Sequence, residues 1–459
     1  MTSSPNSSFT LSNVQAINLS KPSHKINTGI GFFDHMLDQL NSHAQVGVSV
    51  QAITSSDTNG SNIVEKILED RNRHANPAEL QEELMSQVGL ALGAEIRKLI
   101  PAHSNNSKSR FCCPLDEALV ECTLTSNLNE NSDSSNGSGG GGDGSGTLTA
   151  FSLAPYGIYP KNVGRTKIGQ MMTLPLESFF RSLAFSSGLN ISLLKRRGDN
   201  GHHVVESAFK AFSRALRNFI DGTNIDSNVD DENNSTSDNM ASMWGIKSQS
   251  YKEGIDLTRS GKSSRATKET SIDVELKFDG GSSGVSVVTG IQSLNDFYVK
   301  LANEAHISLD VNCSGDTWVD DHHTSEDVSI AIGKVLNTSL GTKAGLNRMW
   351  CAVSKVGEAC VEVTMDLSNR PCLTHDLSLS SSGEEYVGDM SIEMLDHALE
   401  SLVMNAQMTL HIVEKSKGDN MVDLMIATAS AFGKSLRLCA AVDPRRAGRT
   451  ASSKGTLSA

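Results

Sequence analysis

The chain repeats itself, and this internal repeat constrains its fold more than any other feature of the sequence. Thr28-Gly29-Ile30 recurs as Thr289-Gly290-Ile291. Three further pairs follow in the same order: QVGLALG from Gln87 with DVSIAIG from Asp327, DEALVECTL from Asp116 with GEACVEVTM from Gly357, and KRRGDN before Gly201 with KSKGDN before Met421. Because a repeated sequence indicates a structural unit that occurs more than once, we expect two similar domains in tandem.

The repeat also sets the expected domain limits. We place the first repeat at residues 10–222 and the second at 265–459, with a polar linker at 223–264. Within the first repeat, residues 127–147 are rich in Gly and Ser, where the second repeat has only the short segment DLSNRP. Such composition predicts a flexible insertion.

Each repeat alternates two kinds of hydrophobic pattern. In the second repeat, SIDVELKFD, ISLDVNC, CVEVTMDL and MTLHIVE alternate apolar and polar residues, which predicts strands with one solvated face. SEDVSIAIGKVLNTSL, MLDHALESLVMNA and DLMIATASAFGKSLRLC have helical periodicity. We therefore predict an α+β fold of two tandem repeats, each made of two similar βα halves with helices packed between antiparallel or mixed sheets.

Charge and composition exclude several classes of protein. The 40 Lys and Arg residues are outnumbered by 53 Asp and Glu residues, which leaves a net charge of −13 and no basic stripe for nucleic acid. No apolar run is long enough for a membrane span. The eight cysteines form no C-x-x-C motif and lie in apolar surroundings, which is typical of reduced thiols inside cells.

Two copies of H-H-x-x-E stand at predicted helix starts. They are His202-His203-Val-Val-Glu206 and His322-His323-Thr-Ser-Glu326. At about 100° per residue, the first His and the Glu four positions later share one face, and the second His points about a quarter turn away. One motif can therefore hold one metal through its His–Glu pair and offer its second imidazole to another metal. A solvated helix start is the alternative for a single copy, but two copies that open similar helices favour metal binding.

Longer segments around these motifs carry a family resemblance. TGIGFFDHMLDQLNSH (28–43), PLDEALVECTL (114–124), GDNGHHVVESAFKAFSRALRNF (198–219), DDHHTSEDVSIAIGKVL (320–336), SLVMNAQMTLHI (401–412) and DPRRAGRTASSKG (443–455) closely resemble imidazoleglycerol-phosphate dehydratase, an enzyme of histidine biosynthesis. A member of that family is ordinarily one repeat long. The resemblance implies a pair of divalent metal ions, Mn²⁺ in the family, that binds the imidazole ring of the substrate while water is eliminated from its glycerol arm.

Each repeat keeps only half of the family's metal ligands. The family pattern is D-H-M, H-H-x-x-E, a helical E-H, and a second H-H-x-x-E. The first repeat keeps His35, His202, His203 and Glu206, but has Glu82, Glu83, Ser86 and Ser178 at its other ligand positions. The second repeat keeps His322, His323, Glu326 and His397, but has Asp296, Val422, Asp423 and Ile426 at its others. The survivors form one complete set, so we predict one composite site with two divalent metal ions, each held by three histidines and one glutamate.

The resemblance also implies the residues that bind the rest of the substrate. For the phosphate group they are Arg348, Arg370, Ser452, Ser453 and Lys454, and for the rest of the molecule Gln39, His43 and Glu269. The proton must be removed by a carboxylate, and Glu206, Glu326 and Asp116 are the three candidates. We pair Arg110 with Arg348 as its counterpart in the first repeat, and expect it to have no part in phosphate binding.

These observations predict dehydration of imidazole-glycerol phosphate to imidazole-acetol phosphate at one composite site. The alternative is a non-catalytic metal-binding paralogue that acts in assembly or regulation, although such a protein need not keep a complete ligand set. The expected partners are the small phosphorylated imidazole substrate and further copies of the chain in a large homo-oligomer, with no nucleic acid and no membrane. The expected compartment is the cytoplasm or the plastid, because the N-terminal segment carries no secretory signal.

Overall fold

The structure is a computed structural model, and its chain divides into two compact units. The described residues are 9–19, 26–53, 76–101, 108–126, 144–222, 259–278, 284–446, 448–453 and 456–457. The first unit comprises Met1–Cys112 and Ala118–Asp226, and the second comprises Cys113–Glu117 and Ser227–Ala459. Most of the expected insertion and of the expected linker lies outside the described residues.

The second unit contains two four-stranded sheets. The first sheet has β9 (Ser260–Ala266), β10 (Thr270–Lys277), β11 (Val285–Val288) and β12 (Ser308–Gly315), and the second has β13 (Met349–Val356), β14 (Ala359–Asp366), β15 (Cys372–His375) and β18 (Thr409–Ser416). The spatial orders are β9-β10-β12-β11 and β13-β14-β18-β15. In both sheets, the edge strand that is third in sequence pairs parallel to the fourth, while the other pairs are antiparallel. The two halves of the unit therefore share one topology.

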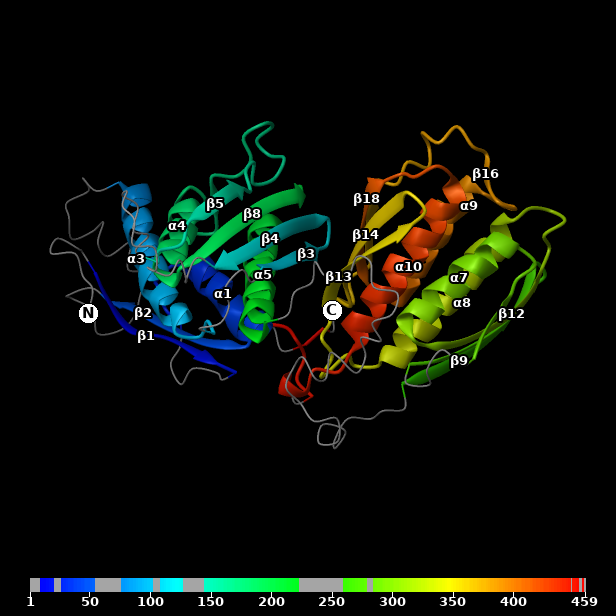
Figure 1. The fold of residues 1–459 in the computed structure, drawn as a ribbon, viewed down its shortest axis with the longest axis horizontal. Coiled ribbons are helices and arrows are strands. Elements are labelled where there is room, and N and C mark those ends of the chain that lie inside the picture. Colours follow the sequence, from blue (N-terminus) through cyan, green and yellow to red (C-terminus); the bar gives the residue numbers. More distant parts are fainter. Residues whose placement is uncertain are drawn as a thin grey trace, which may run out of the picture. The chain divides into compact units, whose positions relative to one another are not determined.

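Four long helices lie between these sheets (Figure 1). They are α7 (Gln292–Ala305), α8 (His322–Leu340), α9 (Ile392–Ala406) and α10 (Met421–Ala440). A small hairpin of β16 (Tyr386–Val387) and β17 (Met390–Ser391) precedes α9, and a short 3-10 turn, η3 (Pro444–Arg446), follows α10. The helices bury their apolar faces, as the hydrophobic periodicity predicts.

The first unit follows a similar element order, but its described part has no counterparts of the edge strands β9 and β11. Its strands are β1 (Thr10–Asn18), β2 (Val46–Ile53), β3 (Lys108–Leu115), β4 (Ala118–Ser126), β5 (Leu148–Ser152), β6 (Lys167–Ile168), β7 (Met171–Met172) and β8 (Leu189–Arg197). Its helices are α1 (Gly31–Gln39), the π-helix η1 (Leu40–Ala44), α3 (Pro77–Arg97), α4 (Pro175–Ser187) and α5 (Gly201–Asp221). The sheet order β3-β4-β8-β5 repeats that of β13-β14-β18-β15. Here too the helices lie between the larger sheet and the β1–β2 pair (Figure 1).

Glycines shared by the two repeats set the spacing of the helices that carry the predicted metal-ligand positions. A Cβ atom on Gly93 of α3 would lie 2.5 Å from the Leu183 carbonyl oxygen of α4, and one on Gly333 of α8 would lie 2.7 Å from the Leu402 carbonyl oxygen of α9. Any larger residue would force these helices apart. The repeated A-L-G and A-I-G sequences therefore keep equivalent helix pairs at close range.

The predicted α+β fold of two repeats with helices between mixed sheets is confirmed. In the described part of the chain, no helix combines the length and the apolar character needed to cross a membrane.

Candidate metal centre

In the first unit, three ligand-type side chains converge from α1 and α5. His35, His202 and Glu206 offer donor atoms that all lie within 4.8 Å of one another. The His202 Nε2 and Glu206 Oε2 atoms, one helical turn apart, are separated by 3.1 Å. His35 Nε2 lies 4.0 Å from the same carboxylate oxygen. We call these three residues cluster 1.

Local sequence positions both helices that carry cluster 1. The Asn200 side chain caps α5 by accepting a hydrogen bond from the His202 backbone N–H at 2.9 Å, so the helix begins where the histidines stand. Asp34, next to His35, accepts hydrogen bonds from the backbone N–H and the hydroxyl of Thr28, at 2.8 and 2.6 Å. These contacts fix the start of α1.

Glu206 is held as an anion. Lys210, one turn further along α5, places its Nζ 2.9 Å from Glu206 Oε1, and both side chains are almost entirely buried. Burial alone would raise the pKa of Glu206, but the hydrogen bond with His202 and the charge of Lys210 outweigh it and hold that pKa well below its ordinary value. Burial lowers the pKa of His35, which favours the neutral imidazole that binds metal.

In the second unit, an equivalent cluster forms from α8 and α9. His322, Glu326 and His397 also present donor atoms within 4.8 Å of one another, and we call them cluster 2. The Nε2 atoms of His322 and His397 each lie 3.6 Å from a Glu326 carboxylate oxygen. At the start of α8, Asp321 accepts hydrogen bonds from the backbone N–H and hydroxyl of Ser391, at 2.6 and 2.8 Å. Because Ser391 immediately precedes α9, this contact aligns the two helices that carry the cluster.

The second histidine of each motif is turned away from its own cluster. The ring centroids of His202 and His203 are 6.0 Å apart with planes at 84°, and His322 and His323 have the same separation and angle. His323 Nδ1 lies 3.2 Å from a carboxylate oxygen of Asp316, a contact that raises the pKa of His323. A carboxylate at Nδ1 orients the ring and leaves Nε2 as the nitrogen that could bind a metal.

The other residues implied by the family resemblance are placed as follows. Gln39 and His43 are fully buried, at the end of α1 and in the π-helix η1, a rare helix type that is frequent at functional sites. Glu269 is exposed in the β9–β10 turn, and its charge contributes to the raised pKa of His323. Asp116 occupies the β3–β4 turn with φ of 49°.

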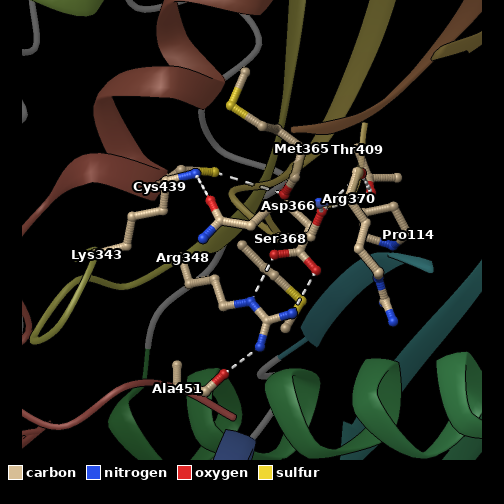
Figure 2. A network of polar contacts seen from close by, with 12 residues as sticks. Pro114, Lys343, Arg348, Met365, Asp366, Ser368, Arg370, Thr409, Cys439 and Ala451 are labelled. Carbon is tan, nitrogen blue, oxygen red and sulfur yellow. Dashed lines mark hydrogen bonds and ion pairs between the residues drawn. The ribbon is translucent and has the colours of Figure 1, made fainter. Parts of the chain in front are cut away.

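The phosphate-binding candidates of the second unit lie around the end of β14. Arg348 is buried, and its guanidinium donates to both Asp366 oxygens, at 2.7 and 2.8 Å, and to the Ala451 carbonyl (Figure 2). Arg370 follows four residues after Asp366. Ser452 and Ser453 come directly after Ala451, and Lys454 lies outside the described residues.

The pairing of Arg110 with Arg348 is wrong. β3 and β13 both lead into two-residue turns, at Asp116–Glu117 and Gly357–Glu358. Arg348 precedes Gly357 by nine positions, but Arg110 precedes Asp116 by only six, so the counterpart of Arg110 is Cys351. Arg110 instead pairs with Glu121 at 2.8 Å. Strand register counted from the turns decides this assignment.

Sequence reasoning missed Lys210, Asp316 and Asp321. The E-x-x-x-K spacing of Glu206 and Lys210 on one helix face was a usable signal. No sequence signal points to Asp316 or Asp321. Asp316 meets His323 through the loop before α8, and Asp321 meets Ser391 through the packing of α9 on α8.

The chemistry of the donor sets fits divalent metal ions. Each cluster provides two imidazole nitrogens and a carboxylate, a set that suits Mn²⁺, Fe²⁺, Co²⁺ or Zn²⁺. Two such clusters on an α+β scaffold define a candidate metalloenzyme.

Comparison with known proteins gives the family. The family model of imidazoleglycerol-phosphate dehydratase matches residues 81–216 and 289–436, more than half of the chain. The chloroplastic imidazoleglycerol-phosphate dehydratase of Pisum sativum is 40% identical over 202 residues, which cover 44% of this chain and 70% of that protein. The enzyme of Prochlorococcus marinus (strain NATL1A) is 36% identical over 203 residues, 44% of this chain and 98% of that protein. This chain belongs to the imidazoleglycerol-phosphate dehydratase family, whose members are hydro-lyases.

A solved structure is also similar. The crystal structure of imidazoleglycerol-phosphate dehydratase from Staphylococcus aureus subsp. aureus N315 has 26% sequence identity and a TM-score of 0.36, and the match covers 40% of this chain and 99% of that one.

Proposed function

We propose that this protein dehydrates imidazole-glycerol phosphate to imidazole-acetol phosphate in histidine biosynthesis, at one composite two-metal site built from both repeats. The proposal rests on one observation. Cluster 1 and cluster 2 occupy helix pairs that are not equivalent in the two repeats, so each repeat keeps the ligand positions that the other lacks. Together with His203 and His323 they make up one full family set. Random loss in two copies would rarely leave a set without a gap or a duplicate.

The geometry of the motifs suggests how the set is divided. Each cluster supplies three ligands, and each H-H-x-x-E motif has one imidazole turned away from its own cluster. In the proposed site His323 completes cluster 1, and His203 completes cluster 2. Each ion would then be held by three histidines and one glutamate, and could still bind substrate or water. The family resemblance favours Mn²⁺ among the metals that such ligands accept.

The chemistry requires loss of a carbon-bound proton and then of a hydroxyl group. Divalent ions held by these residues would supply Lewis-acid chemistry that favours that proton loss. Glu206, Glu326 and Asp116 remain the candidate bases. Glu206 is poorly suited to accept a proton, because Lys210 and His202 stabilise its carboxylate as an anion. Glu326 contacts His322 and His397 at 3.6 Å and has no lysine or arginine partner among the described residues, so its carboxylate is more available than that of Glu206. Asp116 forms an ion pair with Arg370 at 3.0 Å.

The remaining residues would bind the substrate. Arg370, Arg348 and the Ser452–Ser453–Lys454 tail would bind the phosphate, since guanidinium, hydroxyl and ammonium donors suit its oxygens. Glu269 is close enough to His323 for its charge to act on that imidazole, which supports a place beside the metal site. Gln39 lies near His35, with Nε2 3.5 Å from the histidine Nε2.

The proposal extends to the organisation of the protein. We propose a tandem duplication with repeats at 10–222 and 265–459, and a large homo-oligomer. Relatives named chloroplastic, from Pisum sativum and Arabidopsis thaliana, and cyanobacterial relatives leave both plastid and cytoplasm as proposed compartments.

The test is turnover of imidazole-glycerol phosphate by metal-loaded protein, with metal content measured on the same sample. We expect activity and about two metal ions per chain, one for each cluster. About four ions per chain would mean that each repeat holds its own pair and would contradict the composite site. Two bound ions without any turnover would favour the non-catalytic paralogue.

A further inference from the structure

Lys343 is a buried cation to which the proposed mechanism gives no role. It lies six residues before β13, only 1% of it is exposed, and its backbone has a φ of 58°. Burial lowers the pKa of Lys343 to about 8; the nearby charge of Asp366 raises this pKa, whereas that of Arg348 lowers it. Because a buried ammonium group is costly unless it is hydrogen-bonded, its partners indicate what the residue does.

The partners of Lys343 lie in the loop that carries Arg370. Its Nζ donates to the Asn369 side-chain oxygen and, at 3.4 Å, to the Gln407 carbonyl (Figure 2). Asn369 has φ of 58°, a left-handed conformation, and its backbone N–H also donates to the Gln407 carbonyl, at 3.1 Å. Lys343 thus holds the turn immediately before Arg370 against the end of α9.

The rest of this loop is fixed as well. The Ser368 hydroxyl and the Thr409 hydroxyl both donate to the Arg370 carbonyl at 2.9 Å, and the Arg370 N–H donates back to Ser368 at 3.0 Å. Asp366, at the other end of the loop, is held by Arg348. The backbone of Arg370 is therefore tied down on both sides, while its guanidinium extends away from this network, with Nε 3.0 Å from an Asp116 carboxylate oxygen (Figure 2).

We infer that Lys343 is a positioning residue for anion binding: through Asn369 it holds the Asp366–Arg370 loop so that the Arg370 guanidinium is presented in one place. The inference rests on the proposed function, in which Arg370 binds the substrate phosphate. The corresponding stretch of the first repeat, residues 99–107, contains no lysine and no arginine. The network accordingly belongs to the repeat that carries the phosphate-binding candidates.

The test compares Lys343→Met with Asn369→Gly in full-length, metal-loaded protein. Methionine keeps the length of the lysine side chain and removes the donor, while glycine removes the acceptor and tolerates the positive φ. Lys334→Met is the matched control, because Lys334 is an exposed lysine of α8. The readouts are inhibition by inorganic phosphate, inhibition by imidazole, and KM and kcat for imidazole-glycerol phosphate.

We expect either variant to weaken inhibition by phosphate and to raise KM by on the order of tenfold, the loss expected when a charge-assisted contact is misplaced. Inhibition by imidazole and kcat should stay within about twofold, and the double variant should be no worse than either single one, since both act through one bond. If Lys343→Met does not fold, Asn369→Gly alone carries the same expectation.

Unchanged phosphate inhibition in the two variants, or an equal loss of imidazole inhibition, would overturn the positioning role. A wild-type enzyme that phosphate does not inhibit would overturn the proposed phosphate site and this inference with it. The wild-type measurement therefore separates the failure of the proposed function from that of the inference.

Discussion

In the first unit, α3 and α4 carry Glu82 and Ser178 at the positions where α8 and α9 of the second unit carry His322 and His397. The Ser178 hydroxyl donates to a Glu82 carboxylate oxygen at 2.8 Å, so a single hydrogen bond replaces a cluster of three ligands. The reverse holds for the other helix pair. α1 and α5 keep cluster 1, whereas α7 and α10 have Asp296, Val422 and Ile426 at its three positions.

The scaffold around the lost positions is nevertheless retained. Thr289 bonds Asn295 at 2.7 Å as Thr28 bonds Asp34 at 2.6 Å, and Asn420 caps α10 as Asn200 caps α5. Capping, loop geometry and close helix packing stabilise the fold whether or not metal is bound. The same scaffold therefore forms with and without the proposed metal-ligand residues, so in the proposed duplication each repeat could lose half of them and keep its structure.

Substitutions at equivalent positions should therefore have unequal effects, and this is the largest difference we expect. His35→Ala or His397→Ala removes a metal ligand and should lower activity at least about a hundredfold, with loss of bound metal. Ser178→Ala, at the position equivalent to His397, should leave activity within about twofold, because it breaks only an exposed hydrogen bond. Steady-state kinetics with metal analysis checks both, and a Ser178→Ala enzyme as inactive as His397→Ala would contradict the comparison.

Restoring lost ligands should add a metal site. The triple variant Asp296→His, Val422→His, Ile426→Glu recreates the ligands of cluster 1 on α7 and α10, where the cap and the loop are already in place. We expect about one additional metal ion per chain by elemental analysis, with unchanged turnover at the composite site. The single variant Val422→His, which restores one ligand only, is the control and should add none.

Substitution of the proposed phosphate-binding residues should also affect the two repeats differently, but with a smaller change in substrate binding. Arg370→Ala should weaken substrate binding by roughly 1–3 kcal/mol, the loss expected for a charge-assisted contact, and Lys454→Ala should do the same with unchanged metal content. Arg110→Ala should leave KM unchanged, since Arg110 pairs with Glu121 and is not the counterpart of Arg348. A rise in KM for Arg110→Ala equal to that for Arg370→Ala would contradict the assignment of phosphate binding to the second repeat.

The smallest expected effect is on the pH dependence of the free energy of unfolding, through an ion pair in the first unit. Burial alone would raise the pKa of Glu121, but hydrogen bonds from Arg110 and Arg196 outweigh it and lower that pKa. The ion pairs therefore stabilise the folded state above the ordinary carboxyl pKa, and this contribution disappears as pH falls through the lowered value. Arg110→Ala should reduce the free energy of unfolding by about 1–3 kcal/mol at pH 7, with the difference from wild type shrinking in acid. Chemical denaturation across that pH range measures it, and a difference independent of pH would contradict the charge assignment.

Much of the fold follows from local pattern. Period-2 and helical hydrophobicity predicted the strands and helices of the second repeat, and the H-H-x-x-E motifs were expected at the helix starts where α5 and α8 begin. These predictions depend on residues close in sequence, and caps such as Asn200 reinforce them.

Contacts that depend on packing between distant segments could not be predicted in the same way. The burial of Lys343 against Asn369 and the bond from Asp321 to Ser391 join segments with no sequence signal in common. The π-helix at Leu40–Ala44 was also missed, since its counterpart in the second unit, the end of α7, is ordinary α-helix with similar periodicity. Arg110 shows that sequence similarity near a strand edge can misplace a counterpart by three residues.

The most direct test of the composite site is whether a histidine of one repeat serves the cluster of the other. In a chain with His322→Ala, Glu326→Gln and His397→Ala, only cluster 1 remains, and one metal ion should bind. Adding His323→Ala to that chain should weaken the remaining metal about tenfold to a hundredfold by titration, because His323 would complete cluster 1. Adding His203→Ala instead should change its affinity little. An unchanged affinity after His323→Ala would show that each repeat binds its metal alone and would contradict the composite site.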